Sequence, residues 1–142
     1  MTLNSNHPIL LVEDNPVDMD LTLRALRSRH LDNTILTARD GEEALAFIEK
    51  WEKGDPVPVV ILLDLKMPKV NGLEVLKVLK SHELFKTIPV VVLTTSSETS
   101  DVQQAYLLGA NSYIVKPVDF EKFLEVAKQI DLYWRVLNNP NN

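Results

Sequence analysis

The segment VVILLDLKMPKVNG, residues 59–72, decides the fold. Its aliphatic residues run directly into a carboxylate, Asp64, at the point where a strand is expected to end. A short continuous apolar run of this kind is typical of a strand buried on both faces. Burying a carboxylate costs several kcal/mol unless a cation or a set of hydrogen-bond donors compensates it. The segment therefore raises the question of which other residues hold Asp64.

The length and composition of the chain predict one globular domain over residues 1–142, with a core at about 8–137 and polar tails at both ends. The chain has no cysteine, so a disulfide framework and a thiolate zinc site are excluded. No stretch approaches the roughly 20 apolar residues that span a bilayer, and the N-terminus lacks an export signal. The net charge is −5 without a basic run, which disfavours DNA binding. We expect a cytoplasmic protein that contacts neither DNA nor membrane.

Apolar segments alternate with amphipathic ones along the chain. Strands are expected at residues 9–12, 34–38, 59–63, 90–93 and 112–115. Helix starts follow them at Asn15-Pro16, Asp40, Asn71, residues 97–100 and Asp119. Strands that are apolar on both faces and separated by helices imply a parallel sheet that is covered on both sides. The predicted fold class is α/β, a doubly wound five-stranded parallel sheet of the flavodoxin-like type with helices on both faces.

Polar residues follow four of the five expected strands directly: Glu13 and Asp14, Asp64, Thr94 and Thr95, and Lys116. The carboxyl ends of parallel strands share one edge of the sheet, where ligands bind. Three carboxylates at that edge would repel one another and favour a hard divalent cation. Mg²⁺ suits the site better than Ca²⁺ because few protein ligands are available and waters can complete its octahedron. A lysine and a hydroxyl suit the oxygens of a phosphoryl group.

Each of these residues alone has an ordinary structural interpretation. A carboxylate after a strand serves equally well as a helix cap or a solvated loop residue. Thr94 alone would be a turn hydroxyl, Lys116 a surface lysine and Tyr113 a half-buried core residue. Their joint occurrence at four strand ends favours a functional site.

Four segments, LLVEDN, VVILLDLKMPKVNG, PVVVLTTSS and YIVKP, occur in this order between residues 10 and 117. With this set the chain resembles the receiver domains of two-component response regulators, of which the chemotaxis regulator CheY is the single-domain example. The resemblance covers essentially the whole chain. It implies a CheY-like fold and a switch that accepts a phosphoryl group from a sensor histidine kinase. Such a switch catalyses its own phosphorylation and hydrolysis and is not an enzyme for an external metabolite.

The resemblance also implies a metal site and a phosphoacceptor. Asp64 is the expected phosphoacceptor, with Mg²⁺ as the cofactor. Glu13 and Asp14 would hold the Mg²⁺ with Asp64, and the backbone carbonyl of Lys66 would be a further ligand. Glu13 stands where Asp is also common, and a bridging water would accommodate it.

The same resemblance implies a phosphoryl contact and a switch. Thr94 would contact the phosphoryl group and Lys116 would pair with its oxygens. Tyr113 would be the switch aromatic, moving inward as Thr94 shifts. The Lys116–Pro117 bond is expected to be cis, as is usual in this family.

Three positions beside the site are expected to tune the phosphoryl lifetime: Lys66, Thr95 and Ser96. Thr95 stands where a small residue often follows the switch threonine, so it would narrow access to the phosphoryl group. Lys66 and Ser96 occupy the two positions that family members vary for this purpose. The direction of each effect is not readable from the residues.

We expect no output domain after the last helix, so the expected output is a partner protein, another phosphotransfer protein or a second copy of the chain. Apolar residues off the main core stripe form a candidate dimer surface: Leu107, Leu108, Val126, Tyr133 and Val136. An equally good interpretation is that Tyr133 and Val136 cover the sheet edge.

The segments LVEDNPVD, GDPVP and DLYW are similar to a narrower group, the single-domain regulators paired with cyanobacterial and bacterial phytochromes. Members of that group commonly dimerise through the last two helices and the fifth strand. This resemblance implies a phytochrome as the cognate kinase and a homodimer of that kind.

Three other classes are weighed against this reading. A flavin-binding domain would need a phosphate-cradling loop after the first strand, whereas EDNPVD is acidic and has no glycine. An aspartyl phosphatase usually carries a second Asp two residues after the nucleophile, where this chain has Lys66. A phosphorylation-independent scaffold would be expected to have lost Asp64, Thr94 or Lys116, and it stays open as the alternative.

Overall fold

The computed structural model describes residues 7–31 and 33–138, with the side chains of the last helix described through Leu132. The strands in these ranges are β1 (Ile9–Val12), β2 (Ile35–Ala38), β3 (Val60–Leu63), β4 (Val90–Thr94) and β5 (Ser112–Val115). The helices are α1 (Pro16–Arg27), α2 (Gly41–Glu52), α3 (Gly72–Ser81), α4 (Thr99–Leu107) and α5 (Phe120–Asn138). The expected alternation of strands and helices is confirmed. No helix among the described residues is both long and apolar enough to cross a membrane.

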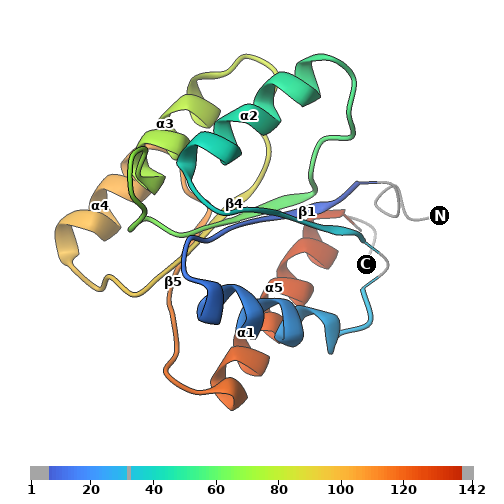
Figure 1. Ribbon diagram of the computed structural model, residues 1–142, viewed down its shortest axis with the longest axis vertical. Coiled ribbons are helices and arrows are strands. Elements are labelled where there is room, and N and C mark those ends of the chain that lie inside the picture. The colour runs from blue at the N-terminus through green and yellow to red at the C-terminus, as the bar shows by residue number, and fades with distance from the viewer. Residues whose placement is uncertain (1–6, 32, 139–142) are drawn as a thin grey trace.

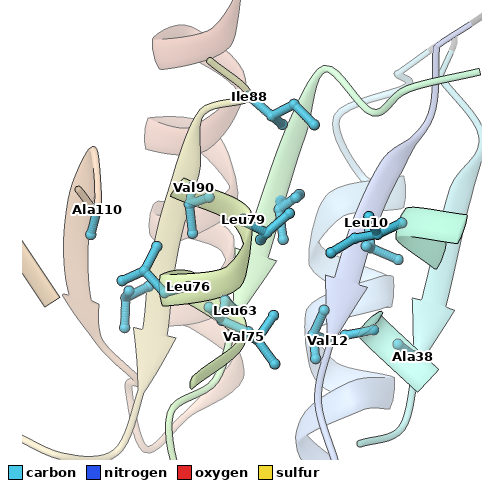
Figure 2. Packing of buried hydrophobic residues seen from close by; sticks show 14 of the residues in the cluster. Leu10, Val12, Ala38, Leu63, Val75, Leu76, Leu79, Ile88, Val90 and Ala110 are labelled. Atoms are coloured by element: carbon cyan, nitrogen blue, oxygen red, sulfur yellow. The ribbon is translucent and has the colours of Figure 1, made fainter. Parts of the chain in front are cut away.

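The five strands form one parallel sheet in the order β2-β1-β3-β4-β5. Figure 2 shows the strand arrows pointing the same way, so the carboxyl ends share one edge. Helices α2, α3 and α4 cover one face of the sheet, and α1 and α5 cover the other (Figure 1). The doubly wound α/β class is confirmed. The strand order reverses between β1 and β3, and such a switch point is where open α/β sheets bind ligands.

Alternate residues of the central strands build two cores. Leu10, Val12 and Leu63 point to the face under α2 and α3, where the packing is visible in Figure 2. Ile9, Leu11 and Leu62 point to the other face, where they meet apolar residues of α1 and α5, including Leu26, Phe123 and Ile130. Because β1 and β3 are buried on both faces, their carboxyl ends are fixed in the rigid centre of the molecule.

Side-chain caps begin four of the helices. The Asn15 side chain accepts hydrogen bonds from the backbone N–H groups of residues 17 and 18, at 2.9 and 3.0 Å. Asp40, Asn71 and Asp119 each accept a backbone N–H three residues further on. Helix α4 differs, because its cap residue, Glu98, makes no side-chain cap hydrogen bond. The expectation of a side-chain cap within residues 97–100 is therefore wrong.

The backbone corrects one further expectation. None of the peptide bonds in the described ranges is cis, so the Lys116–Pro117 bond is trans here. A trans bond is the lower-energy form of an X–Pro bond by about 0.5–1 kcal/mol.

Candidate functional site

Three carboxylates meet at the switch point of the sheet. Glu13 and Asp14 directly follow β1, and Asp64 directly follows the neighbouring strand β3. One oxygen from each lies within 4.8 Å of the others. Glu13 and Asp64 are buried, whereas Asp14 is exposed and leaves the cluster open to solvent on that side. The convergence expected from the strand ends is thus present in the structure.

The buried ammonium of Lys116 is bound by three carboxylates. Its Nζ lies 2.5 Å from Glu13 Oε1, 3.0 Å from Asp18 Oδ2 and 3.2 Å from Asp64 Oδ2. Lys116 follows β5, which is separated from β3 by β4, so the long side chain spans the intervening strand end. The lysine provides one positive charge for a cluster that carries several negative ones.

Asp18 is a member of this cluster that the pattern of strand ends did not reveal. It lies in the first turn of α1 rather than after a strand, and acidic residues are ordinary there because they favour the helix N-terminus. Helical side chains lean toward the N-terminus of their helix, which brings Asp18 back over the sheet edge. No local pattern in the sequence distinguishes it from other acidic residues in a first helical turn.

The titration of the cluster reflects its burial and its excess of negative charge. Burial raises the pKa of Glu13 from 4.5 to about 7, and the charge of Asp64 adds to the rise while the hydrogen bond from Lys116 opposes it. Burial alone would lower the pKa of Lys116, but its bonds to Glu13 and Asp18 and the charge of Asp64 outweigh that effect and raise it. Lys116 is therefore a permanent cation, while Glu13 is only marginally ionised near neutrality.

Backbone packing positions Asp64 tightly. Its N–H donates to the Val12 carbonyl at 3.0 Å, and its Oδ1 accepts the Lys66 N–H at 3.2 Å. Helix α3 begins against the same backbone at Gly72, where an added Cβ would lie 2.2 Å from the Asp64 carbonyl oxygen. Only glycine allows this approach, so the Asn71-Gly72 helix start is part of what fixes the carboxylate.

Thr94, the last residue of β4, contributes a hydroxyl without a partner. Its Oγ1 is the buried side-chain polar atom that lacks a hydrogen bond within the described part of the chain. A buried unsatisfied hydroxyl costs about 1–3 kcal/mol, and such a group calls for an explanation. A bound group with acceptor oxygens at this edge would provide the missing partner.

Tyr113 and the three expected tuning positions lie on the α4 side of the site. The Tyr113 hydroxyl donates to the Ser96 carbonyl oxygen at 2.7 Å. The Ser96 hydroxyl donates to Asp101 Oδ2 at 2.5 Å, and Lys66 Nζ lies 3.2 Å from the same oxygen. Thr95 is exposed. Asp101 was missed in the sequence, because a single acid in the first turn of a helix is ordinary.

The candidate dimer surface is only partly apparent in the structure. Leu107 is 85% exposed, whereas Leu108 and Val126 are half-buried and pack against the two cores. The side chains of Tyr133 and Val136 lie outside the described residues. Further exposed apolar residues occur on α4, at the end of β5, in the loop that follows it and at the start of α5: Tyr106, Val115, Val118 and Phe120.

Comparison with known proteins places this site in a family. The family model of the response regulator receiver domain matches residues 9–128. Among curated proteins, the chain is 42% identical over 127 residues to the probable methanogenesis regulatory protein FilR2 of Methanothrix harundinacea, covering 89% of this chain and 82% of that one. It is 38% identical over 138 residues to the response regulator Rcp1 of Synechocystis sp., covering 94% of each chain.

Solved structures agree with this assignment. Phosphorylated RcpA, a cyanobacterial phytochrome response regulator, superposes with a TM-score of 0.84 at 38% identity, over 91% of this chain and 94% of that chain. The Mn²⁺-bound form of Rcp1 superposes with a TM-score of 0.82 at 38% identity, over 90% and 94% of the two chains. The bacteriophytochrome response regulator RtBRR is 49% identical, with a TM-score of 0.74 over 89% and 77%. By sequence and by fold, the chain belongs to the response regulator receiver domain family.

Proposed function

We propose that this chain is a phosphoacceptor switch in which Asp64 receives a phosphoryl group from a sensor histidine kinase. The observation that carries the proposal is the surroundings of the Asp64 carboxylate. A permanent ammonium, Lys116, lies 3.2 Å from its Oδ2, and the partnerless hydroxyl of Thr94 ends the next strand of the sheet. These are the groups that a transferred phosphoryl group requires.

The reaction follows from these groups. A carboxylate oxygen of Asp64 forms a bond to phosphorus, the P–N bond of the donor phosphohistidine breaks, and its electron pair returns to the imidazole. Lys116 neutralises charge on the phosphoryl oxygens, and the Thr94 hydroxyl donates a hydrogen bond to one of them. In hydrolysis a water oxygen bonds to phosphorus, the bond to Asp64 breaks, and inorganic phosphate leaves. The chain is then ready for another cycle, as a switch rather than an enzyme for a metabolite.

The residues at the site suit a divalent cation, for which we propose Mg²⁺. Glu13, Asp14 and Asp64 offer converging oxygens, and the backbone carbonyl of Lys66 would be a further ligand. A bound cation would oppose the effects of burial and of the Asp64 charge, which together raise the pKa of Glu13. A bound Mg²⁺ supplies charge neutralisation for the phosphoryl oxygens. The similar protein Rcp1 has been solved in a Mn²⁺-bound form, which supports the binding of a divalent ion by this chain.

The switch would link Thr94 to Tyr113. When the Thr94 hydroxyl turns to a phosphoryl oxygen, the segment that follows it shifts, and with it the Ser96 carbonyl that accepts the Tyr113 hydroxyl. We propose that Tyr113 then moves inward, and that Lys66, Thr95 and Ser96 tune how long the phosphoryl group persists. Both changes would reach the surface formed by α4, β5 and α5.

The kinase and the output are proposed from the similar proteins. RcpA and RtBRR are phytochrome and bacteriophytochrome response regulators, which supports a phytochrome as the cognate kinase. The exposed apolar residues around Leu107 support a homodimer through α4, β5 and α5. The proposal includes a cytoplasmic location and no direct contact with DNA.

The acceptor role is tested by incubating the protein with acetyl phosphate and Mg²⁺ and measuring the intact mass. One phosphoryl adduct is expected for the wild type and for Asp20→Asn, an exposed acid of α1 that serves as the control. No adduct is expected for Asp64→Asn. An adduct that persists in Asp64→Asn would place the acceptor elsewhere, and no adduct in the wild type would favour the phosphorylation-independent scaffold.

The partner proposals have their own tests. Leu107→Asp is expected to abolish a dimer in analytical ultracentrifugation, while Leu84→Asp, at a site 70% exposed after α3, leaves it intact. Wild type that sediments as a monomer, with and without acetyl phosphate, would contradict the dimer. Phosphotransfer profiling against the histidine kinases of the source organism is expected to select a phytochrome-type kinase, and selection of another class would overturn that pairing.

A further inference from the structure

One carboxylate connects the loop after the proposed phosphoacceptor to the segment after Thr94. Asp101 Oδ2 accepts the hydroxyl of Ser96 at 2.5 Å and lies 3.2 Å from Lys66 Nζ. Lys66 belongs to the β3–α3 loop, and its N–H donates to Asp64 Oδ1. Ser96 lies two residues after Thr94, and its carbonyl accepts the Tyr113 hydroxyl. Asp101 therefore contacts the two residues that connect to the rest of the site. Lys66 bonds to Asp64, and Ser96 follows Thr94 and bonds to Tyr113.

The position of Asp101 at the start of α4 favours its contacts with Ser96 and Lys66. Helix α4 has no side-chain cap, and Asp101 is the acid of its first turn, close to the positive end of the helix dipole. Hydrogen bonds to a charged acceptor are shorter and stronger than neutral ones. The Asp101 side chain is 15% exposed and that of Lys66 is 56% exposed, so solvent screens the Lys66 contact more than the contact with buried Ser96.

The two contacts of Asp101, with Ser96 and with Lys66, oppose the movement that the proposed switch involves. In the proposed switch, residues 94–96 shift when the Thr94 hydroxyl turns to a phosphoryl oxygen, yet Ser96 is held to α4 through Asp101. The ammonium of Lys66 would also be drawn toward a phosphoryl group on Asp64, because that group carries about two negative charges against one on Asp101. Phosphorylation and the Asp101 contacts thus compete for Ser96 and Lys66.

We propose that Asp101 is a positioning residue that holds Lys66 and the segment of residues 94–96 in the unphosphorylated arrangement. The strength of its contacts then sets how readily Asp64 accepts and keeps a phosphoryl group. This inference rests on the proposed acceptor role of Asp64. It proposes that two of the three tuning positions, Lys66 and Ser96, are restrained by the same residue of α4. Lys66 and Ser96 act, in this account, largely through Asp101.

The first test uses the unphosphorylated protein and compares Asp101→Asn with Glu98→Gln. Both changes remove one negative charge at the start of α4, but only the Asp101 side chain contacts Ser96 and Lys66. Glu98 contacts Ser96 through its backbone N–H, which Glu98→Gln leaves in place. Hydrogen exchange of the Val102 N–H, which bonds to the Glu98 carbonyl in the first helical turn, is expected to quicken about tenfold in Asp101→Asn. A change below about twofold is expected in Glu98→Gln. Equal exchange in the two variants would overturn the restraint.

The second test measures the response of the site. Beryllium fluoride with Mg²⁺, a phosphoryl mimic, is expected to bind Asp101→Asn about tenfold more tightly than the wild type, because the competing contact is gone. In a Lys66→Met background the same substitution should have a smaller effect, since the two residues share one contact. Unchanged affinity, weaker affinity or full additivity would overturn the inference.

The two proposals fail in different ways. If the wild type forms an acetyl-phosphate adduct but Asp101→Asn binds the mimic no better, the acceptor role stands and the Asp101 inference falls. If the wild type forms no adduct and binds no beryllium fluoride, the acceptor role falls, and the Asp101 inference falls with it.

Discussion

Replacing Glu13 by Gln tests whether the buried acidic cluster destabilises the metal-free protein. The pKa of the Glu13 carboxyl rises from its ordinary value of 4.5 to about 7 in the folded chain, because the carboxyl is buried and lies beside Asp64. Between these values the folded state binds more protons than the unfolded state, so stability falls as pH rises from about 4.5 to 7. One pKa unit corresponds to about 1.36 kcal/mol, so the full cost above pH 7 is about 3.4 kcal/mol. Glutamine does not titrate and escapes this cost.

The measurement is the free energy of unfolding in urea at pH 5 and pH 8, with EDTA present. The stability of Glu13→Gln relative to the wild type is expected to rise by about 2.5 kcal/mol between these two pH values. Comparing the two proteins at each pH cancels the titration of the other groups. The control, Asp20→Asn, removes an exposed acid paired with Arg24, and its relative stability should change by less than about 0.5 kcal/mol.

Magnesium extends the same test. Added Mg²⁺ should stabilise the wild type at pH 8 in proportion to the logarithm of its concentration, and should stabilise Glu13→Gln less. A relative stability that does not change with pH, or that falls toward pH 8, would refute the reasoning. Either result would mean that the 2.5 Å contact with Lys116 keeps Glu13 fully ionised and outweighs its burial.

Three further substitutions test other parts of the site. Gly72→Ala should lower the free energy of unfolding by about 1–3 kcal/mol, because its Cβ would lie 2.2 Å from the Asp64 carbonyl oxygen; an unchanged urea midpoint would contradict that packing. Thr94→Val should raise the stability by about 1 kcal/mol while slowing adduct formation from acetyl phosphate, since it removes a partnerless hydroxyl. A loss of stability would show that the hydroxyl is satisfied. Lys116→Met should cost about 3–5 kcal/mol in EDTA, and a loss below about 1 kcal/mol would show that the lysine is not the main counter-charge of the cluster.

The sheet and most of the site could be predicted from the sequence because their signals are local. The buried strand before Asp64 reads as one apolar run, and Asn15-Pro16 marks a helix start directly after the first acidic pair. Since parallel strands end at one edge, placing Lys116 beside Asp64 required only the fold class. The cap of α4 was harder, because residues 97–100 offer several candidates and the structure uses none of their side chains for a cap bond.

The acids within helices could not be recognised in advance. Asp18 and Asp101 lie in first helical turns, where an acidic residue is expected for the helix dipole alone. What distinguishes them is tertiary: Asp18 meets a lysine from the far end of the chain, and Asp101 meets Lys66 and Ser96 from two different loops. No periodicity or cap rule encodes such meetings, so they appear only when the sheet edge has been assembled.

Two unfavourable features of the site would each be relieved by a bound group. The raised pKa of Glu13 and the partnerless hydroxyl of Thr94 both reduce the stability of the protein as it stands. A divalent cation would relieve the first, and a phosphoryl group on Asp64 would relieve the second. Conflicts of this kind are expected where function, rather than stability, selects the residues. The two-sided core under β1 and β3 stabilises the fold independently of these residues. In the proposed switch, the free energy released when the two features are relieved would move the segment of residues 94–96, which Asp101 is proposed to restrain.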